Sequence, residues 1–288
     1  MQAGKQETGH PPYDPLLPPE MAVRAEEVGV AKARLDTISL LALAVLAGAF
    51  IAFGAVFTTV TISGTTDTLP YGVVRLLGGL AFSLGLVLVV IGGAELFTGN
   101  NLMVMAWAGR MISLRTLLRA WTLAYVGNFV GAVGMAILVF LSGQHASGGG
   151  SVGRTMLSIA HNKAAIPFVE AVALGILCNV LVCLAVWLTY SARTVTGKIL
   201  AIVPPIAAFV AAGFEHSVAN MYFLPAGLLI KWFADAEYWR VLGTAAADYP
   251  DLTLAGMANN LVPVTIGNVI GGGVLVGIVY WFVYLRKR

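Results

Sequence analysis

The sequence predicts an all-α membrane protein of six transmembrane helices, arranged as two inverted three-helix repeats with broken second and fifth helices. Of the 288 residues, 58% are hydrophobic and only 11% are charged, whereas soluble domains carry roughly 25% charged residues. Six apolar stretches are each long enough to cross a bilayer, which takes about 20 residues of helix. A polar motif recurs in the second and the fifth stretch. These observations exclude a soluble enzyme.

The chain begins with a polar segment, residues 1–36, that contains several prolines. It lacks the early apolar run of a cleavable signal peptide. Residues 16–35 within it are amphipathic, because Met21, Ala25 and Val28 share one helical face. We expect a cytoplasmic segment whose helix lies on the inner leaflet, the alternative being a helix that covers the mouth of a pore. A membrane domain of six spans is expected to follow as residues 37–288.

The six spans are expected at 37–62, 72–108, 114–142, 165–190, 199–231 and 259–285. The second and the fifth are too long for one straight helix, and each is interrupted by polar residues, "GGAELFTGNN" (92–101) and "GFEHSVANM" (213–221). Non-helical backbone at membrane depth is tolerated only where it faces protein or a water-filled cavity. Both spans are therefore predicted to be broken helices.

The two interruptions share the pattern G-x-E-x-x-x-x-N, with Glu95 and Asn100 recurring 120 positions later as Glu215 and Asn220. A second echo joins "GNFVG" (127–131) to "GNVIG" (267–271), where small residues four apart allow close helix packing. The repeats run from about 37–142 and from about 165–285. Because each contains an odd number of spans, the second is inverted. Paired broken helices in inverted repeats place a permeation or binding site between the halves.

Lys and Arg residues are distributed unevenly between the two ends of these spans. With the N-terminus inside, the cytoplasmic side collects Lys5, Arg24, Lys32, Arg34, Arg110, Arg115, Arg119, Arg193, Lys198, Arg286, Lys287 and Arg288. The outer side is left with Arg75, Arg154, Lys163, Lys231 and Arg240. Because short cytoplasmic loops carry an excess of Lys and Arg, we expect a multi-pass protein of the cell inner membrane with both termini in the cytoplasm.

His216 is the one histidine that falls inside a predicted span. An ionisable residue at that depth is a functional hypothesis by default, and its place at a symmetric break disfavours the alternative of a neutral core histidine. Glu95 and Glu215 would repel an anion, so we expect them to accept hydrogen bonds from backbone groups freed by the breaks. Asn100 and Asn220 are expected to share this scaffold role.

Cys178 and Cys183 lie five positions apart in one span and point to different helical faces. We interpret them as packing residues, so neither a disulfide nor a metal site is expected. An enzyme is also not expected. His216 and Ser217 diverge by about 100° as neighbours on a helix and are badly placed as base and nucleophile.

The stretches "GGAELFTGNN", "LGILCNVLVCLAVW" (174–187), "GFEHSVANM" and "NNLVPVTIGNVIGGG" (259–273) resemble the formate/nitrite transporter family, and bacterial formate channels most of all. The resemblance runs over nearly the whole chain. It implies an aquaporin-like fold and a homopentamer in membrane lipid with one pore per protomer. The implied substrate is formate, with nitrite and hydrosulfide as alternatives, and neither a cofactor nor nucleic acid is implied.

The resemblance also assigns residues to the pore. It implies that Thr98 faces the pore opposite a central His216, with Asn179 nearby. It implies an outer-vestibule role for Lys163, which charge alone leaves balanced against a snorkelling lysine. The remaining assignments are an inner constriction of Phe82, Leu86 and Phe209 and an outer constriction of Leu96, Phe97 and Val182.

A formate ion that enters a dry constriction loses its hydration at a large cost. A cationic His216 could hold the anion by charge, or it could hand a proton to this weak acid, which would then cross as a neutral molecule. Apolar rings disfavour a bare ion, so the second route is expected, with transport coupled to protons at low pH. Whether the protein works as a channel or as a proton-coupled symporter stays open at this point.

Overall fold

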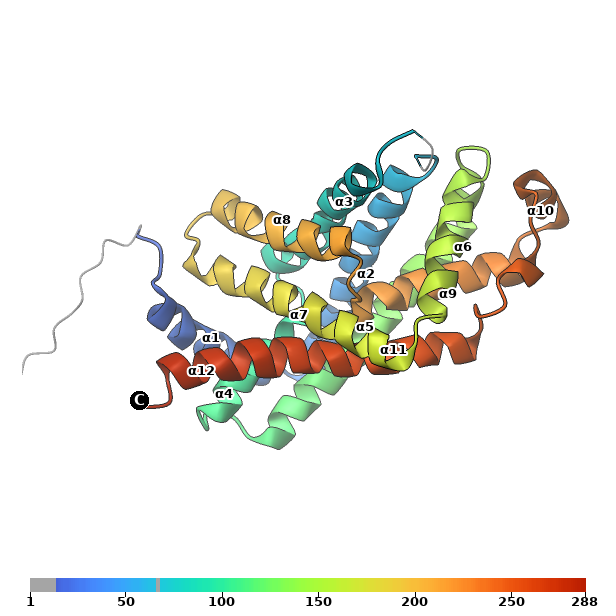
Figure 1. Cartoon of the computed structure of the whole chain (residues 1–288). Coiled ribbons are helices and arrows are strands. Elements are labelled where there is room, and N and C mark those ends of the chain that lie inside the picture. Colours follow the sequence, from blue (N-terminus) through green and yellow to red (C-terminus); the bar gives the residue numbers. More distant parts are fainter. Residues whose placement is uncertain (1–13, 66–67) are drawn as a thin grey trace, which may run out of the picture.

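The computed structural model describes residues 14–65 and 68–288, which fold into helices joined by short connections (Figure 1). The first 13 residues of the predicted N-terminal segment, Lys5 among them, lie outside these ranges. The elements in chain order are α1 (Pro18–Ala33), α2 (Thr37–Ile62), α3 (Tyr71–Gly92), η1 (Gly99–Met103), α4 (Val104–Ala108), α5 (Leu114–Leu141), η2 (Gln144–Ala146), α6 (Ser151–Ala164), α7 (Phe168–Ser191), α8 (Val195–Ala212), α9 (Ser217–Phe233), α10 (Ala236–Leu242), η3 (Ala246–Asp248), α11 (Leu254–Asn268), η4 (Val269–Ile278) and α12 (Val279–Tyr284).

Six helical segments of the described chain are long and apolar enough to cross a membrane: α2, α3, α5, α7, α8 and the continuous stretch from α11 to α12. The predicted six spans are therefore confirmed. Several begin where a polar side chain caps the first turn, as the carboxylate of Asp36 does by accepting the backbone N–H groups of Ile38 and Ser39 at 3.0 Å. Ser113 caps α5 through the N–H of Thr116 in the same way.

Both predicted breaks are present. Gly93 caps the end of α3 and Gly213 caps the end of α8, with φ angles of 78° and 79° respectively. A left-handed residue that ends a helix is usually glycine, because glycine carries no Cβ to clash. The chain then runs without regular helix until η1 in the first half and until α9 in the second.

The two halves have the same internal packing. In the first half α2 packs against α3 and α5, and in the second half α7 packs against α8 and α11. α3 and α8 pack against each other and join the halves. Figure 1 shows α1, α4, α12 and the C-terminus at one end of the molecule, with α6 and α10 towards the other.

Each half also carries a short helix before its first span, α1 in the first and α6 in the second. The sequence interpretation treated the α1 region as a helix lying on the leaflet, yet Met21, Ala22 and Ala25 of this helix are buried in a cluster with residues of α4 and α7. α6 was not predicted. The first repeat is thus longer than residues 37–142, because α1 belongs to it as α6 belongs to the second.

The glycines of the two GNxxG stretches permit close helix contact, as predicted. A Cβ on Gly131 would lie 1.9 Å from the carbonyl oxygen of Val45, and one on Gly271 would lie 2.2 Å from that of Ile176. The last span was predicted as a plain helix over residues 259–285. In the structure its middle, η4, winds as a π-helix that contains Gly271.

Candidate functional site

Each break is held by one buried asparagine of its own repeat. In the first half, Asn128 Oδ1 accepts the backbone N–H of Phe97 at 2.9 Å. Its Nδ2 donates to the carbonyls of Ala44 and Glu95 at 2.7 and 2.9 Å. A buried backbone group without a partner is costly, and this side chain satisfies three of them at the point where the helix is interrupted.

The second half repeats this arrangement atom for atom. Asn268 Oδ1 accepts the N–H of Ser217 at 2.9 Å, and its Nδ2 donates to the carbonyls of Gly175 and Glu215 at 2.8 and 3.0 Å. Sequence reasoning interpreted the GNxxG stretches as packing motifs and missed the role of these asparagines. The signal was available, because Asn128 and Asn268 recur at the same place in both echoes.

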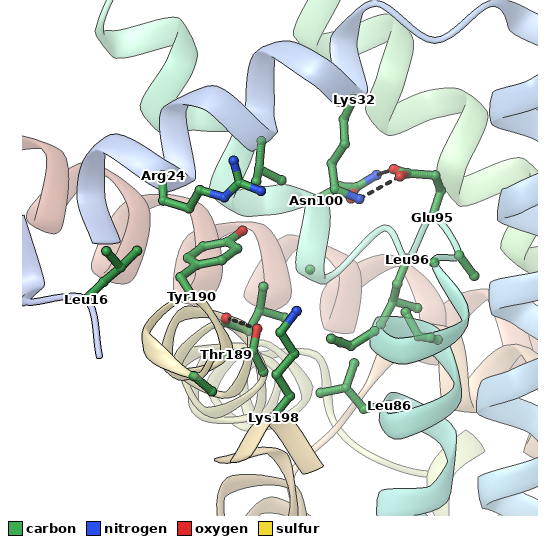
Figure 2. A pocket seen from close by; sticks show the side chains of 18 of the residues that line it. Leu16, Arg24, Lys32, Leu86, Glu95, Leu96, Asn100, Thr189, Tyr190 and Lys198 are labelled. Carbon is green, nitrogen blue, oxygen red and sulfur yellow. Dashed lines mark hydrogen bonds and ion pairs between the residues drawn. The ribbon is translucent and has the colours of Figure 1, made fainter. Parts of the chain in front are cut away.

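The carboxylates of the breaks do not accept the freed backbone groups, so that expectation was wrong. Glu95 Oε1 pairs with Lys32 Nζ at 2.6 Å, and its Oε2 accepts Asn100 Nδ2 at 2.8 Å (Figure 2). The reason is side-chain length. The short Asn128 side chain already forms hydrogen bonds with the free backbone groups of the break, and the longer glutamate side chain extends past them to a lysine.

The second glutamate makes the equivalent contacts. Glu215 Oε1 pairs with Lys163 Nζ at 2.5 Å, and its Oε2 accepts Asn220 Nδ2 at 2.6 Å. Asn100 and Asn220 therefore steady the two carboxylates. Lys32 was not among the predicted site residues, although it precedes Lys163 by 131 positions. The same interval separates Leu43 from Leu174, whose carbonyls accept the N–H groups of Glu95 and Glu215.

His216 and Thr98 contact each other across the two breaks, as the family resemblance implied. Thr98 Oγ1 lies 2.9 Å from His216 Nε2, and both residues are almost completely buried. The backbone N–H of Ala219 donates to His216 Nδ1 at 3.1 Å and caps α9. Since Nδ1 accepts, it carries no proton in this structure. The proton of the neutral ring then sits on Nε2 and is donated to the Thr98 hydroxyl.

Asn179 lies beside Thr98 rather than beside the histidine ring. Its Nδ2 is 3.3 Å from the Thr98 carbonyl, 2.8 Å from Asn101 Oδ1 and 2.7 Å from the carbonyl of Asn268. Cys183 Sγ also donates to the Thr98 carbonyl, at 3.3 Å. These contacts fix the backbone of Thr98, so its hydroxyl is held towards the histidine.

The Thr98–His216 contact is also where the two repeats differ. With the interval of 120 that relates Glu95 to Glu215, the counterpart of His216 is Leu96 and the counterpart of Thr98 is Val218. The scaffold of the breaks is thus symmetric, while the polar pair between them is not.

Two cavities lie on either side of this pair. The cavity that we call inner, towards α1, has a volume of about 560 Å³ and is lined by Arg24, Lys32, Leu86, Glu95, Leu96 and Lys198 among others (Figure 2). The cavity that we call outer has a volume of about 370 Å³ and is lined by Arg75, Phe82, Lys163, Phe209, Glu215 and His216 among others.

The predicted constrictions are exchanged in part. Phe82 and Phe209 were expected on the inner side, yet both line the outer cavity, where their rings meet edge to face with centroids 5.7 Å apart. Leu96 was expected on the outer side and lines the inner cavity together with Leu86. The reason is chain direction: α3 enters from the outer end, so Phe82 lies one turn outside Leu86 and Leu96 follows the inner end of the helix.

The other two predicted outer residues line neither cavity. Phe97 packs edge to face against Tyr125 and Trp121, with centroid distances of 5.0 and 6.3 Å. Val182 is buried on α7 within the hydrophobic core. Among the described residues, no group of three or more His, Cys, Asp or Glu side chains is placed to hold a metal ion, and Cys178 and Cys183 are free thiols.

The fold and the site together define a polytopic membrane protein of two inverted repeats with a buried polar contact between opposed cavities. The family model for formate/nitrite transporters matches residues 19–282. The chain belongs to the formate/nitrite transporter family.

Its relatives include two proteins named formate channel FocA. The protein from Escherichia coli (strain K12) is 46% identical over 278 residues, which is 96% of this chain and 97% of the relative. The protein from Haemophilus influenzae is 41% identical over 264 residues, which is 91% of this chain and 93% of the relative.

Solved structures with the same fold include one described as a pentameric formate channel with formate bound. It has a TM-score of 0.83 and 45% sequence identity, and the match covers 87% of this chain and 98% of that chain. A second, described as an ion channel of the same family, has a TM-score of 0.77 and 29% identity over 92% of this chain and 98% of that chain.

Proposed function

We propose that this protein is a homopentameric formate channel of the cell inner membrane, with a pore in each protomer. The observation that carries the proposal is the buried Thr98–His216 contact, which lies between two cavities at the point where the repeat symmetry is broken. Relatives named formate channel, at 46% and 41% identity over nearly their whole length, favour formate over other small anions.

The route of the anion follows the axis between the cavities. Lys163 in the outer cavity and Lys32 in the inner cavity attract the ion at either end, and their glutamate partners limit how tightly it is held. The anion passes Phe82 and Phe209, meets the polar pair at the centre, and leaves past Leu86 and Leu96. Asn179 acts in this route by positioning Thr98.

Proton transfer at the centre is part of the proposal. A cationic His216 would give its Nε2 proton, through the Thr98 hydroxyl, to the formate oxygen. Formate would become formic acid, and the ring would be left neutral with its proton on Nδ1. It regains the starting tautomer when Nδ1 releases that proton and Nε2 takes one up. The cation first needs a proton on Nδ1, which now accepts the N–H of Ala219. Protonation is therefore coupled to loss of the cap on α9, so it requires a small movement of the break.

We further propose that both termini are cytoplasmic, so the inner cavity faces the cytoplasm. The excess of Lys and Arg at the end that carries α1 and the C-terminus supports this orientation. Cysteines placed singly at Ser147 and at Lys287 test it. A membrane-impermeant thiol reagent added to intact cells should label the first and spare the second, and the reverse pattern would exclude this orientation.

Uptake of labelled formate into proteoliposomes tests the function, with nitrite and hydrosulfide as competing substrates over a series of pH values. We expect formate uptake that rises as the pH falls, and weaker uptake of the other two. The variant His216→Ala should lose this pH dependence. Formate uptake in His216→Ala with the wild-type pH profile would contradict the proton step while leaving the channel assignment intact.

A further inference from the structure

The two cavities differ in charge, although the two repeats that line them have the same fold. The inner cavity is lined by four cationic side chains, Arg24, Lys32, Arg193 and Lys198, and by a single carboxylate, that of Glu95. In the outer cavity two cations face two carboxylates, with Arg75 and Lys163 opposite Glu170 and Glu215. The inner cavity therefore carries an excess of positive charge, and the outer cavity is balanced.

The repeat does not account for this excess. With the intervals that relate the two halves, the counterpart of Arg24 is Thr155 and the counterpart of Lys198 is Gly78. Lys32 and Glu95 are matched by Lys163 and Glu215, which pair in the same way. The outer cavity also has an unmatched cation, because the counterpart of Arg75 is Val195, but there the carboxylate of Glu170 balances its charge. The unmatched cations of the inner cavity have no such carboxylate among the lining residues.

The side chain of one of these cations has no partner in the described part of the chain. Lys198 is half-buried at the start of α8, and its ammonium group forms no hydrogen bond or ion pair with any residue between 14 and 65 or 68 and 288. Figure 2 shows its side chain extending into the same space as Arg24. Within residues 14–65 and 68–288, Arg24 pairs only with the exposed Glu27, at 3.2 Å. Arg193 Nε donates to the backbone carbonyl of Asp14 at 2.8 Å. Their charges are left to attract an anion in the cavity.

The size of the cavity indicates which anion would use these charges. A volume of about 560 Å³ holds roughly 18 heavy atoms at about 30 Å³ each, far more than the three of formate. Leu86 and Leu96 are among the residues that line it. An anion with two or more charged groups can offer a separate group to each of several cations, whereas a single carboxylate has to share its two oxygens among them.

We propose that the inner cavity is a binding site for a small organic or inorganic polyvalent anion, one with at least two carboxylate or phosphate groups. Such a ligand contacts Lys198, Arg193 and Arg24 and obstructs the pore from the end that carries α1. The obstruction rests on the proposed channel function, whereas binding at the cavity does not.

Calorimetric titration of the detergent-solubilised full chain tests binding. Citrate and pyrophosphate represent the carboxylate and phosphate classes, and gluconate, which has as many heavy atoms as citrate but one charge, is the control ligand. We expect at least one of the two polyanions to bind, with Lys198→Gln and Arg193→Gln each weakening its binding about tenfold, as loss of a charged hydrogen bond does. Lys287→Gln, on the same face but outside the cavity, should change nothing.

Gluconate binding as tight as that of citrate, no binding of either polyanion, or equal affinity in Lys198→Gln and wild type would each overturn the proposal. Formate currents in planar bilayers then test the obstruction, after the orientation has been assigned from protease cleavage of a C-terminal tag. The polyanion should reduce the current from the side of the termini and not from the other. Equal reduction from both sides would refute the site, whereas absence of any formate current without polyanion would instead contradict the proposed function.

Discussion

Truncation of the two asparagines that hold the breaks should destabilise the protein by the same amount. Asn128 and Asn268 are fully buried, and each makes three hydrogen bonds to backbone groups at lengths between 2.7 and 3.0 Å. Asn128→Ala or Asn268→Ala removes all three. At about 0.6 to 1.5 kcal/mol for each bond, the free energy of unfolding should fall by about 2 to 4 kcal/mol in either variant.

Unfolding by SDS in mixed lipid micelles measures this loss, with helix content as the readout. Asn162→Ala serves as a matched control, because the exposed side chain of this asparagine makes no hydrogen bond to the described residues and its loss should cost less than about 0.5 kcal/mol. A loss below about 1 kcal/mol for Asn128→Ala or Asn268→Ala would refute the claim that these side chains carry the breaks. The claim would also be refuted if the losses of unfolding free energy in the two variants differed by more than the smaller loss.

Three further predictions concern the centre, the helix packing and the N-terminal helix. Thr98→Val should lower formate flux about tenfold to hundredfold, which corresponds to the loss of one hydrogen bond to a charged group. Size-exclusion chromatography should show that the assembly is intact. Unchanged flux would exclude the Thr98 hydroxyl from the route. Gly131→Ala should destabilise the protein by about 1 to 3 kcal/mol or more, because the new Cβ meets the Val45 carbonyl, whereas Gly134→Ala, with nothing within 4 Å, should not. Burial raises the pKa of the Glu26 carboxyl above 4.5, so the folded protein binds this proton more readily than the unfolded chain does, and stability rises as the pH falls through the raised pKa. Glu26→Gln should therefore flatten the dependence of thermal stability on pH between about pH 7 and pH 4. A pH dependence identical to that of the wild type would contradict this.

The sequence was sufficient for the spans and the breaks, since each has a local signature. Apolar runs mark the helices, and the repeated G-x-E-x-x-x-x-N marks both interruptions. The family resemblance then placed Thr98 opposite His216, a contact between residues 118 positions apart that no local pattern encodes.

The features that sequence reasoning missed depend on the direction in which a helix enters the bundle and on which helices pack against each other. Which side of the centre Phe82 lies on follows from the end at which α3 enters the bundle, and motif assignment does not record that. The pairing of Lys32 with Glu95 requires α1 to dock on the channel body. An amphipathic pattern gives a helix an apolar face but does not say whether lipid or protein covers it.

The matched ion pairs of Lys32 with Glu95 and Lys163 with Glu215 have a consequence for biosynthesis. Because the repeats are inverted, the two lysines end on opposite sides of the bilayer. Whichever way the chain is inserted, one lysine stays on the side of the ribosome and the other is translocated before it reaches its glutamate. With the N-terminus inside, that lysine is Lys163, which must cross together with Arg154 against the usual retention of positive charge. The second half therefore completes its break only after the α6 segment has been exported, whereas the first half completes its own break from the cytoplasm.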